Sequence, residues 1–305
     1  MTWHPADEAA ARETPPGGPI EAVIVPRARD IGGFAVKRVL PAARRRSVGP
    51  FVFFDQMGPA DFPPGSGLDV RPHPHIGLAT VTYLFEGEQV HRDSLGTVQV
   101  IRPGDVNLMS AGRAIAHSER TDPALRASGS RLAGIQSWIA LPQAHEDSAP
   151  RFAHHAASSL PLIARGGSSV RLIAGALHGQ RSPVETLSPT LYADVTLEAG
   201  GSLEIPADYA ERALYPVDGV IALAGESYEA GQLLVLKPGA AVTLDAATPA
   251  RLMLLGGAPL DGPRHIWWNF VSSSTDRIEQ AKADWKARRF PVIPTDDEEF
   301  IPLPE

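Results

Sequence analysis

Two short stretches of the sequence decide the fold: GLDVRPHPH at residues 67–75 and GRAIAHSE at residues 112–119. They place four side chains of types that bind metals, His73, His75, His117 and Glu119, in two pairs whose members stand two residues apart. Because successive side chains on a β-strand point to opposite faces, each pair would present both of its side chains to one side. Two such strands facing each other predict a metal site built from these four residues.

The ligand types narrow the choice of metal. Three imidazoles and one carboxylate suit a first-row transition ion better than Ca²⁺ or Mg²⁺, which prefer oxygen ligands. We expect one divalent ion, Fe(II) first, with Mn, Ni, Cu and Zn as alternatives. A structural zinc site usually has four ligands that often include cysteine, and the chain has no cysteine. An octahedral ion held by four protein ligands would keep two positions open for substrate or dioxygen.

His91 lies between the two pairs, in the sequence VHRDS at residues 90–94. We expect it behind the ligands or in the pocket wall rather than on the metal, because no partner for a ligand pair stands two residues away. Further candidates for the pocket are the apolar Phe53, Phe54 and Met109 and the polar Arg113.

The composition favours a mainly all-β globular fold. The 305 residues, 43% of them hydrophobic, suffice for two medium domains or one large one. The 28 glycines and 29 prolines are spread between short apolar runs, which favours short strands and tight turns.

Charge and cysteine content restrict the partners and the compartment. A formal charge of -7 and a pI near 5.8 argue against a nucleic-acid partner. The absence of cysteine excludes disulfides and thiol catalysis and is compatible with a reducing cytoplasm. No stretch approaches the length of a membrane span, and residues 1–18 lack the apolar core of a secretory signal. We therefore expect a cytoplasmic protein without a membrane partner.

Strand-like runs recur in two series, over residues 34–141 and 170–255, and predict two tandem antiparallel β-barrels or jelly rolls. The expected division is a poorly ordered lead-in at 1–18, a metal-binding barrel at 19–145, a second barrel at 146–272, and a helix with a tail at 273–305. The phrase GQLLVLKPG at 231–239 resembles VQVIRPGD at 98–105, which indicates an ancient duplication. Because no histidine occurs between His178 and His265, the second barrel is expected to be metal-free.

The tail contains one predicted helix. Asp276 and Glu279 stand at the spacing of a capped helix start, although Ser274 or Thr275 could serve as the cap instead. The apolar residues that follow at helical spacing are Ile278, Ala281 and Trp285. This helix should pack on the outside of a barrel.

These motifs resemble the cupins and, within them, the pirin family, over about residues 20–304. The general cupin pattern runs from Gly67 through His73 and His75 and then expects a glutamate where this chain has Thr80. In pirin-like proteins the carboxylate instead follows the third histidine by two residues, as Glu119 does. Further phrases typical of the family are VGPFVFFD at 48–55, HRDSLG at 91–96 and WWNFVSSS at 267–274. The resemblance implies a bicupin with one metal, usually iron, in the N-terminal barrel.

The resemblance also implies two kinds of function. Some pirin-like proteins have quercetin 2,3-dioxygenase activity, in which a flavonol binds the metal and dioxygen opens its heterocycle with release of carbon monoxide. Glu119 would then be both a ligand and a catalytic base for the flavonol hydroxyl. Other members act without turnover as regulatory or redox-sensing proteins on a protein partner, which this sequence does not identify. A metal-bound isomerase or a carbohydrate-binding cupin is a third reading, because the fold hosts many activities.

Overall fold

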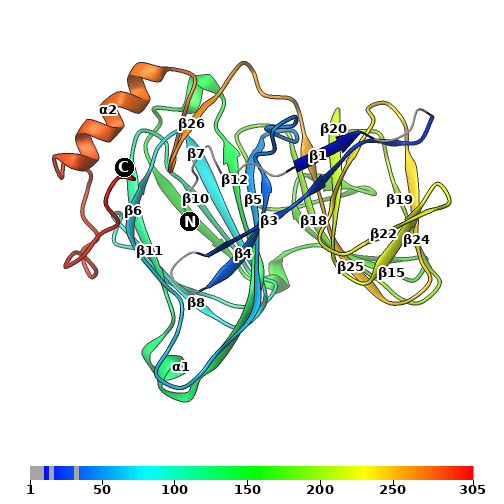
Figure 1. Ribbon diagram of the computed structural model, residues 1–305, viewed down its shortest axis with the longest axis horizontal. Coiled ribbons are helices and arrows are strands. Elements are labelled where there is room, and N and C mark those ends of the chain that lie inside the picture. Colours follow the sequence, from blue (N-terminus) through cyan, green and yellow to red (C-terminus); the bar gives the residue numbers. More distant parts are fainter. Residues whose placement is uncertain (1–9, 14–16, 31–33, 305) are drawn as a thin grey trace.

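The structure of the protein is a computed structural model that describes residues 10–13, 17–30 and 34–304. The described part consists of two β-barrels, and one long helix lies on the side of the N-terminal barrel away from the second barrel (Figure 1). The predicted mainly all-β fold, with two tandem antiparallel barrels and a C-terminal helix, is confirmed.

The N-terminal barrel is built from two antiparallel sheets. The larger has seven strands, in the order β13 (Arg151–His155), β10 (Val106–Ser110), β7 (Leu78–Glu86), β12 (Ser130–Ala140), β5 (Phe51–Phe62), β4 (Ala35–Leu40) and β3 (Arg27–Asp30). The smaller has the order β6 (Asp69–His75), β11 (Ile115–Arg120), β8 (Gln89–Asp93) and β9 (Val98–Ile101). Helix α1 (Pro123–Ser128), capped by the side chain of Asp122, joins the smaller sheet to the larger. Both predicted ligand pairs fall on the smaller sheet.

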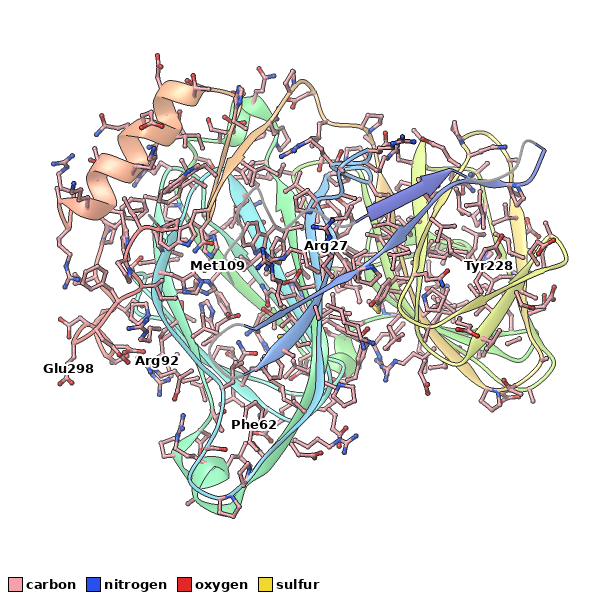
Figure 2. All side chains as sticks on the ribbon, viewed as in Figure 1. Arg27, Phe62, Arg92, Met109, Tyr228 and Glu298 are labelled. Carbon is pink, nitrogen blue, oxygen red and sulfur yellow. The ribbon has the colours of Figure 1, made fainter. Side chains whose placement is uncertain are left out.

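The C-terminal barrel has the same plan. Its larger sheet has the order β1 (Ala10–Glu13), β2 (Ile20–Val25), β23 (Leu233–Leu236), β20 (Glu211–Asp218), β25 (Ala250–Gly257), β18 (Thr190–Leu197), β15 (Ser168–Ala174) and β14 (Leu162–Arg165). Its smaller sheet has the order β19 (Gly201–Ile205), β24 (Val242–Ala246), β21 (Val220–Leu223) and β22 (Glu226–Glu229). The short strands β16 (Ala176–Leu177) and β17 (Gln180–Arg181) form a separate hairpin. Buried apolar side chains form a core in each barrel, and Figure 2 draws the side chains on the ribbon.

Two strands cross the expected division at residue 145. β2 pairs with β23 in the C-terminal sheet, and β13 pairs with β10 in the N-terminal sheet. Each strand supplies backbone hydrogen bonds to a strand that would otherwise be a free sheet edge. The domain bounds themselves remain a prediction. The expected lead-in at 1–18 lies largely outside the described residues, although residues 10–13 form β1.

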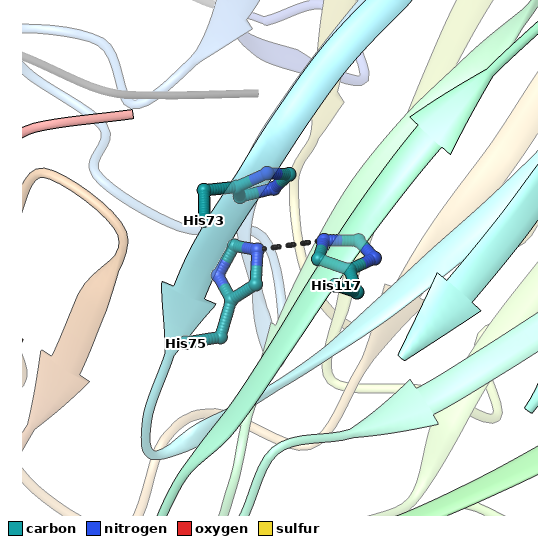
Figure 3. A group of neighbouring side chains, drawn as sticks. All are labelled: His73, His75 and His117. Carbon is teal, nitrogen blue, oxygen red and sulfur yellow. Dashed lines mark hydrogen bonds between the residues drawn. The ribbon is translucent and has the colours of Figure 1, made fainter. Parts of the chain in front are cut away.

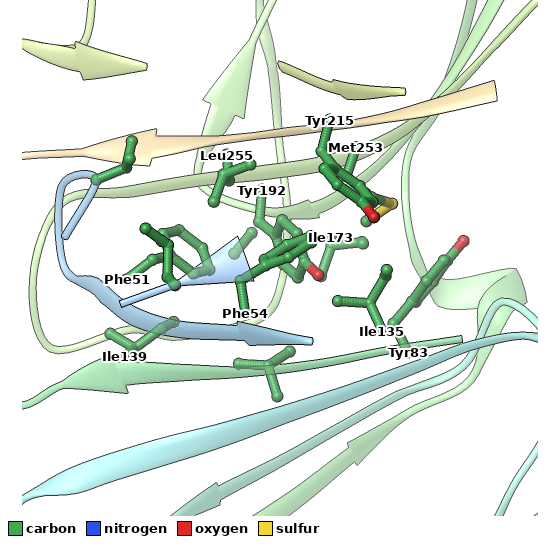
Figure 4. Close-up of a cluster of buried hydrophobic side chains, with 14 of the residues drawn as sticks. Phe51, Phe54, Tyr83, Ile135, Ile139, Ile173, Tyr192, Tyr215, Met253 and Leu255 are labelled. Atoms are coloured by element: carbon green, nitrogen blue, oxygen red, sulfur yellow. The ribbon is translucent and has the colours of Figure 1, made fainter. Parts of the chain in front are cut away.

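The two large sheets pack face to face across an apolar layer (Figure 4). Phe51 contacts Tyr192, with ring centroids 5.1 Å apart, and Phe54 meets Tyr215 edge-on at 5.3 Å. Polar contacts also join the two sheets: the Tyr215 hydroxyl donates to Gln56 Oε1 at 2.7 Å, and the Tyr83 hydroxyl donates to Asp194 Oδ2 at 2.8 Å. This packing covers the outer face of the large N-terminal sheet, and its inner face is turned toward the smaller sheet that carries the predicted ligand pairs.

The C-terminal segment returns to the N-terminal barrel. The hairpin β26 (His265–Trp267) and β27 (Phe270–Ser272) leads into helix α2 (Thr275–Lys286), which Ser274 caps. Its buried residues are Ile278, Ala281 and Trp285, as predicted. They pack against the hairpin and against Ile76 and Ala116 on the outside of the barrel. No helix in the described ranges is long and apolar enough to cross a bilayer.

Candidate metal centre

The two predicted ligand pairs lie on neighbouring strands. β6 and β11 are antiparallel, and His73 stands opposite His117 in the register. On the other side of β11, His117 pairs with Asp93 and Glu119 pairs with His91 of β8. Since alternate residues of a strand face the same side, these strands bring six polar side chains to one face: His73, His75, His91, Asp93, His117 and Glu119.

Three of these side chains converge in the barrel interior (Figure 3). The ligand atoms of His73, His75 and His117 all lie within 4.8 Å of one another. The three residues are at most 1% exposed. Burial lowers the pKa of each imidazole well below 6.5, so that all three are neutral at pH 7 and each keeps one nitrogen lone pair.

The backbone determines which nitrogen of two rings carries the hydrogen. His73 Nδ1 lies 2.8 Å from the carbonyl oxygen of Arg71, and His75 Nδ1 lies 3.2 Å from that of Asn269. A carbonyl oxygen only accepts hydrogen bonds, so both Nδ1 atoms donate and both Nε2 atoms hold lone pairs. His117 Nδ1 lies 3.3 Å from His91 Nδ1, while His117 Nε2 faces His75.

The distance between His75 Nε2 and His117 Nε2, 3.0 Å, has the size expected for two ligands of one ion (Figure 3). Ligands roughly 2.1 Å from a metal stand about 3.0 Å apart at a right angle and about 3.4 Å apart at a tetrahedral angle. Two nitrogen lone pairs in such close contact repel each other unless a cation or a hydrogen lies between them. The separation of His75 Nε2 and His117 Nε2 therefore fits two ligands of one divalent ion.

Glu119 follows His117 by two residues and is 2% exposed. It does not belong to the group whose ligand atoms lie within 4.8 Å of one another. In the described part of the chain, no residue donates a hydrogen bond to its carboxylate or forms an ion pair with it. A buried carboxylate without a partner is unfavourable. Glu119 thus has the burial and the missing counter-charge expected of a fourth ligand.

His91 lies beside the three histidines, between His117 and Asp93. Its Nε2 is 2.9 Å from Asp93 Oδ2, and its ring stacks on Phe152 with centroids 4.6 Å apart. Burial raises the pKa of Asp93, but hydrogen bonds from His91, Thr97 and Leu95 lower it more, so the pKa lies below its ordinary value. The sequence reasoning overlooked Asp93, although it stands two residues after His91, the same spacing that identified the ligand pairs.

The predicted pocket walls are only partly right. Phe53 stacks on Trp138 at 4.0 Å, and Trp138 meets the ring of His75 edge-on at 5.3 Å. The prediction that Phe54 lines the pocket is wrong, because its side chain points to the opposite face of β5 and contacts Tyr215 of the second barrel. Arg113 is exposed in the turn before β11 and is not a pocket contact.

Met109 and Thr80 stand opposite each other on β10 and β7, and Thr80 stands opposite Trp138 on β12. These residues therefore share the face that carries Phe53. Thr80 occupies the position where the general cupin pattern has its glutamate, and it offers no carboxylate there. The sequence reasoning missed Trp138, for which no motif or spacing gave a signal.

The C-terminal segment supports the strands of the site from outside. Ser118, between His117 and Glu119, donates its hydroxyl to Asp296 Oδ2 at 2.6 Å. Arg120 donates to the same carboxylate from Nε at 2.6 Å and from a terminal nitrogen at 2.8 Å. The backbone N–H of Ile301 donates to the carbonyl oxygen of Pro72 at 2.8 Å. Residues far along the chain thus hold both ligand-bearing strands.

Fold and site together define a bicupin with a candidate metal centre in its N-terminal barrel. The Pirin family model matches residues 33–139, and the Pirin C-terminal cupin domain model matches residues 192–291. The chain belongs to the pirin family, as its motifs predicted.

Relatives from the same family match most of the length of this chain. A pirin-like protein of Caulobacter vibrioides is 51% identical over 94% of this chain and 100% of its own length. Pirin of Mus musculus is 31% identical over 83% of this chain and 87% of its own length. The crystal structure of a quercetin 2,3-dioxygenase from Acinetobacter baumannii superposes with a TM-score of 0.87 at 34% identity, and covers 93% of this chain and 94% of that one.

Proposed function

We propose that this protein is a metal-dependent oxidoreductase of the quercetin 2,3-dioxygenase type, with one divalent ion, Fe(II) by preference, in the N-terminal barrel. The observation that carries the proposal is the convergence of His73, His75 and His117, of which two rings are oriented by backbone carbonyl oxygens that leave the hydrogen on Nδ1. The similarity to the Acinetobacter baumannii dioxygenase structure supplies the reaction class.

Each residue of the site has a proposed role. The three Nε2 atoms and the Glu119 carboxylate would hold the ion. When bound, the ion would supply Lewis acidity toward the vicinal oxygens of a flavonol. Glu119 would also accept the proton of the flavonol hydroxyl on a carboxylate oxygen, because no other described group competes for that carboxylate. Phe53 and Trp138 would form an aromatic wall beside His75.

The test combines metal analysis with turnover. Iron-loaded protein is incubated aerobically with quercetin while flavonol absorbance and carbon monoxide are followed. The dioxygenase proposal expects carbon monoxide release that disappears in His75→Ala and persists in the control His265→Ala, which changes an exposed histidine. If Glu119→Gln kept both the metal and full turnover, the base role would be wrong.

Burial of the centre favours a second candidate. The three histidines are 0%, 0% and 1% exposed, so a flavonol could reach them only after side chains move. An iron-dependent redox-sensing or regulatory protein needs no such access, since electron transfer and metal-state changes occur in buried centres. Bound metal without flavonol cleavage would support this candidate. A protein without metal would contradict both.

A further inference from the structure

A continuous chain of polar contacts runs through the centre and ends in a hydrogen-bond acceptor on both sides. Asp93 Oδ2 lies 2.9 Å from His91 Nε2, and His91 Nδ1 lies 3.3 Å from His117 Nδ1. His117 Nε2 lies 3.0 Å from His75 Nε2, and His75 Nδ1 lies 3.2 Å from the carbonyl oxygen of Asn269. All five residues are at most 5% exposed, so the chain of contacts is shielded from bulk solvent.

The hydrogens of this chain can be counted. When all three imidazoles are neutral, each carries one N–H, and the three rings supply three hydrogens to four contacts. From one end, the carboxylate of Asp93 requires the hydrogen of His91 on Nε2, which makes His91 Nδ1 an acceptor for His117 Nδ1–H. From the other end, the Asn269 carbonyl requires the hydrogen of His75 on Nδ1. The contact between His117 Nε2 and His75 Nε2 is left with two lone pairs and no hydrogen.

We propose that Asp93 is a positioning residue for the metal centre, because as a pure acceptor it leaves the His75–His117 contact without a hydrogen and so reserves that contact for a divalent cation. The inference rests on the proposed metal binding and adds a role for a residue that does not touch the metal. The Asp93 carboxylate acts through His91, which transmits the position of the hydrogen to His117.

The substitution Asp93→Asn tests this role because the surroundings fix the orientation of the new amide. Asp93 Oδ1 accepts the backbone N–H groups of Leu95 at 2.9 Å and Thr97 at 3.1 Å. The amide oxygen of Asn would stay on these two donors, and its NH₂ group would face His91 Nε2. His91 would then carry its hydrogen on Nδ1 and His117 on Nε2, which donates to His75. Four hydrogens now satisfy four contacts, and no contact is left for a cation.

The control is Asp105→Asn. Asp105 is also buried and also accepts two backbone N–H groups, from Arg102 at 3.1 Å and Ala157 at 2.8 Å. A histidine, His154, lies 3.8 Å from it, but neither residue belongs to the chain of contacts. Loss of a buried carboxylate charge therefore affects both variants, whereas the shift of hydrogens affects only Asp93→Asn.

The experiment measures Zn²⁺ affinity by competition with a chelator at pH 8, together with the ¹⁵N spectrum of the histidines in the metal-free proteins. Asp93→Asn is expected to bind Zn²⁺ about 10- to 100-fold more weakly, with Asp105→Asn close to wild type. The spectrum should show the His117 hydrogen moved to Nε2. An affinity of Asp93→Asn equal to that of Asp105→Asn, with the His117 hydrogen unmoved, would overturn the proposal.

A second variant guards against misfolding of the first. His91→Phe keeps a ring to stack on Phe152 but removes the acceptor opposite His117 Nδ1. With no acceptor opposite Nδ1, His117 would carry its hydrogen on Nε2 and donate it to His75. The Zn²⁺ affinity of His91→Phe should therefore also fall, and an unchanged affinity would contradict the proposal. If the wild-type protein binds no Zn²⁺, the proposed function fails, while the ¹⁵N spectra still decide where Asp93 directs the hydrogens.

Discussion

His75 Nε2 and His117 Nε2 lie 3.0 Å apart in the closed interior of the N-terminal barrel. That separation corresponds to two ligands at a right angle on one ion and is shorter than the tetrahedral value of about 3.4 Å. Cobalt(II) substituted into the protein should therefore show the weak visible absorption of a six-coordinate ion. Intense absorption typical of tetrahedral cobalt would contradict this geometry, and His265→Ala should leave the spectrum unchanged.

Glu119→Gln should have opposite effects on stability and on metal binding. The substitution removes a buried charge that has no described partner, so the metal-free protein should gain about 1 kcal/mol or more in unfolding free energy. Its affinity for a divalent metal should fall. Denaturant unfolding of the metal-free protein measures the first effect.

Glu146→Gln is the matched control for that substitution. Glu146 is also buried, but it accepts hydrogen bonds from Ser272 and Ser273 at 3.0 Å and pairs with Arg264. Its substitution should destabilise the protein. If both glutamine variants destabilised the metal-free protein equally, Glu119 would have a structural partner. Its proposed role as a metal ligand would then lose its support.

The buried ion pair between Arg38 and Asp55 should be costly to break. Arg38 Nε and a terminal nitrogen donate to the two carboxylate oxygens at 3.0 and 2.8 Å, and both side chains are at most 1% exposed. Asp55→Ala would leave the guanidinium charged and buried, with an expected loss of about 3–5 kcal/mol in unfolding free energy. Arg131→Ala, which breaks exposed pairs, should cost less than about 1 kcal/mol. Equal losses of unfolding free energy in the two variants would contradict the conclusion that the Arg38–Asp55 pair is buried and stabilising.

The contact of the C-terminal tail with β11 should depend on pH. Burial raises the pKa of Asp296, but hydrogen bonds from Arg120 and Ser118 lower it more, so the pKa lies below its ordinary value. A carboxyl group with a lowered folded-state pKa contributes stability that is fully present above about pH 3.9 and is lost as the pH falls through the folded-state pKa.

Protection of residues 287–301 from hydrogen exchange should therefore persist at neutral pH and disappear in acid. In Asp296→Asn it should already be weakened at pH 7, whereas the exposed Asp297→Asn should behave as wild type. Protection that is the same in all three proteins at every pH would show that Asp296 does not hold the tail.

The sequence predicts the parts of the site that depend on local periodicity. The two-residue spacing of His73 and His75 placed both rings on one face of a strand, and the spacing of Ile278, Ala281 and Trp285 placed the buried side of α2. Predictions from the sequence fail where contacts between distant parts of the chain determine which way a side chain points. Phe54 and Phe53 are adjacent apolar residues, and only the packing of the second barrel determines which of them faces outward.

Contacts across long sequence separations left no local signal. The carbonyl oxygen of Asn269 supports His75 from 194 residues away, and Asp296 supports Ser118 from 178 residues away. Similarly, β2 precedes the first barrel in sequence but completes the sheet of the second, because the edge of β23 accepts it. Asp93 differs from these cases. Its two-residue spacing from His91 is visible in the sequence, but only the hydrogen-bond geometry shows that it contacts His91 beside the three histidines.

The most direct test of the central claim is elemental analysis of the purified wild-type protein beside the double variant His73→Ala/His75→Ala, after both have been exposed to Fe(II) and freed of loosely bound metal. The account predicts one divalent ion per wild-type chain and none in the double variant. Wild-type protein that holds no metal, or a double variant that holds as much as wild type, would contradict it.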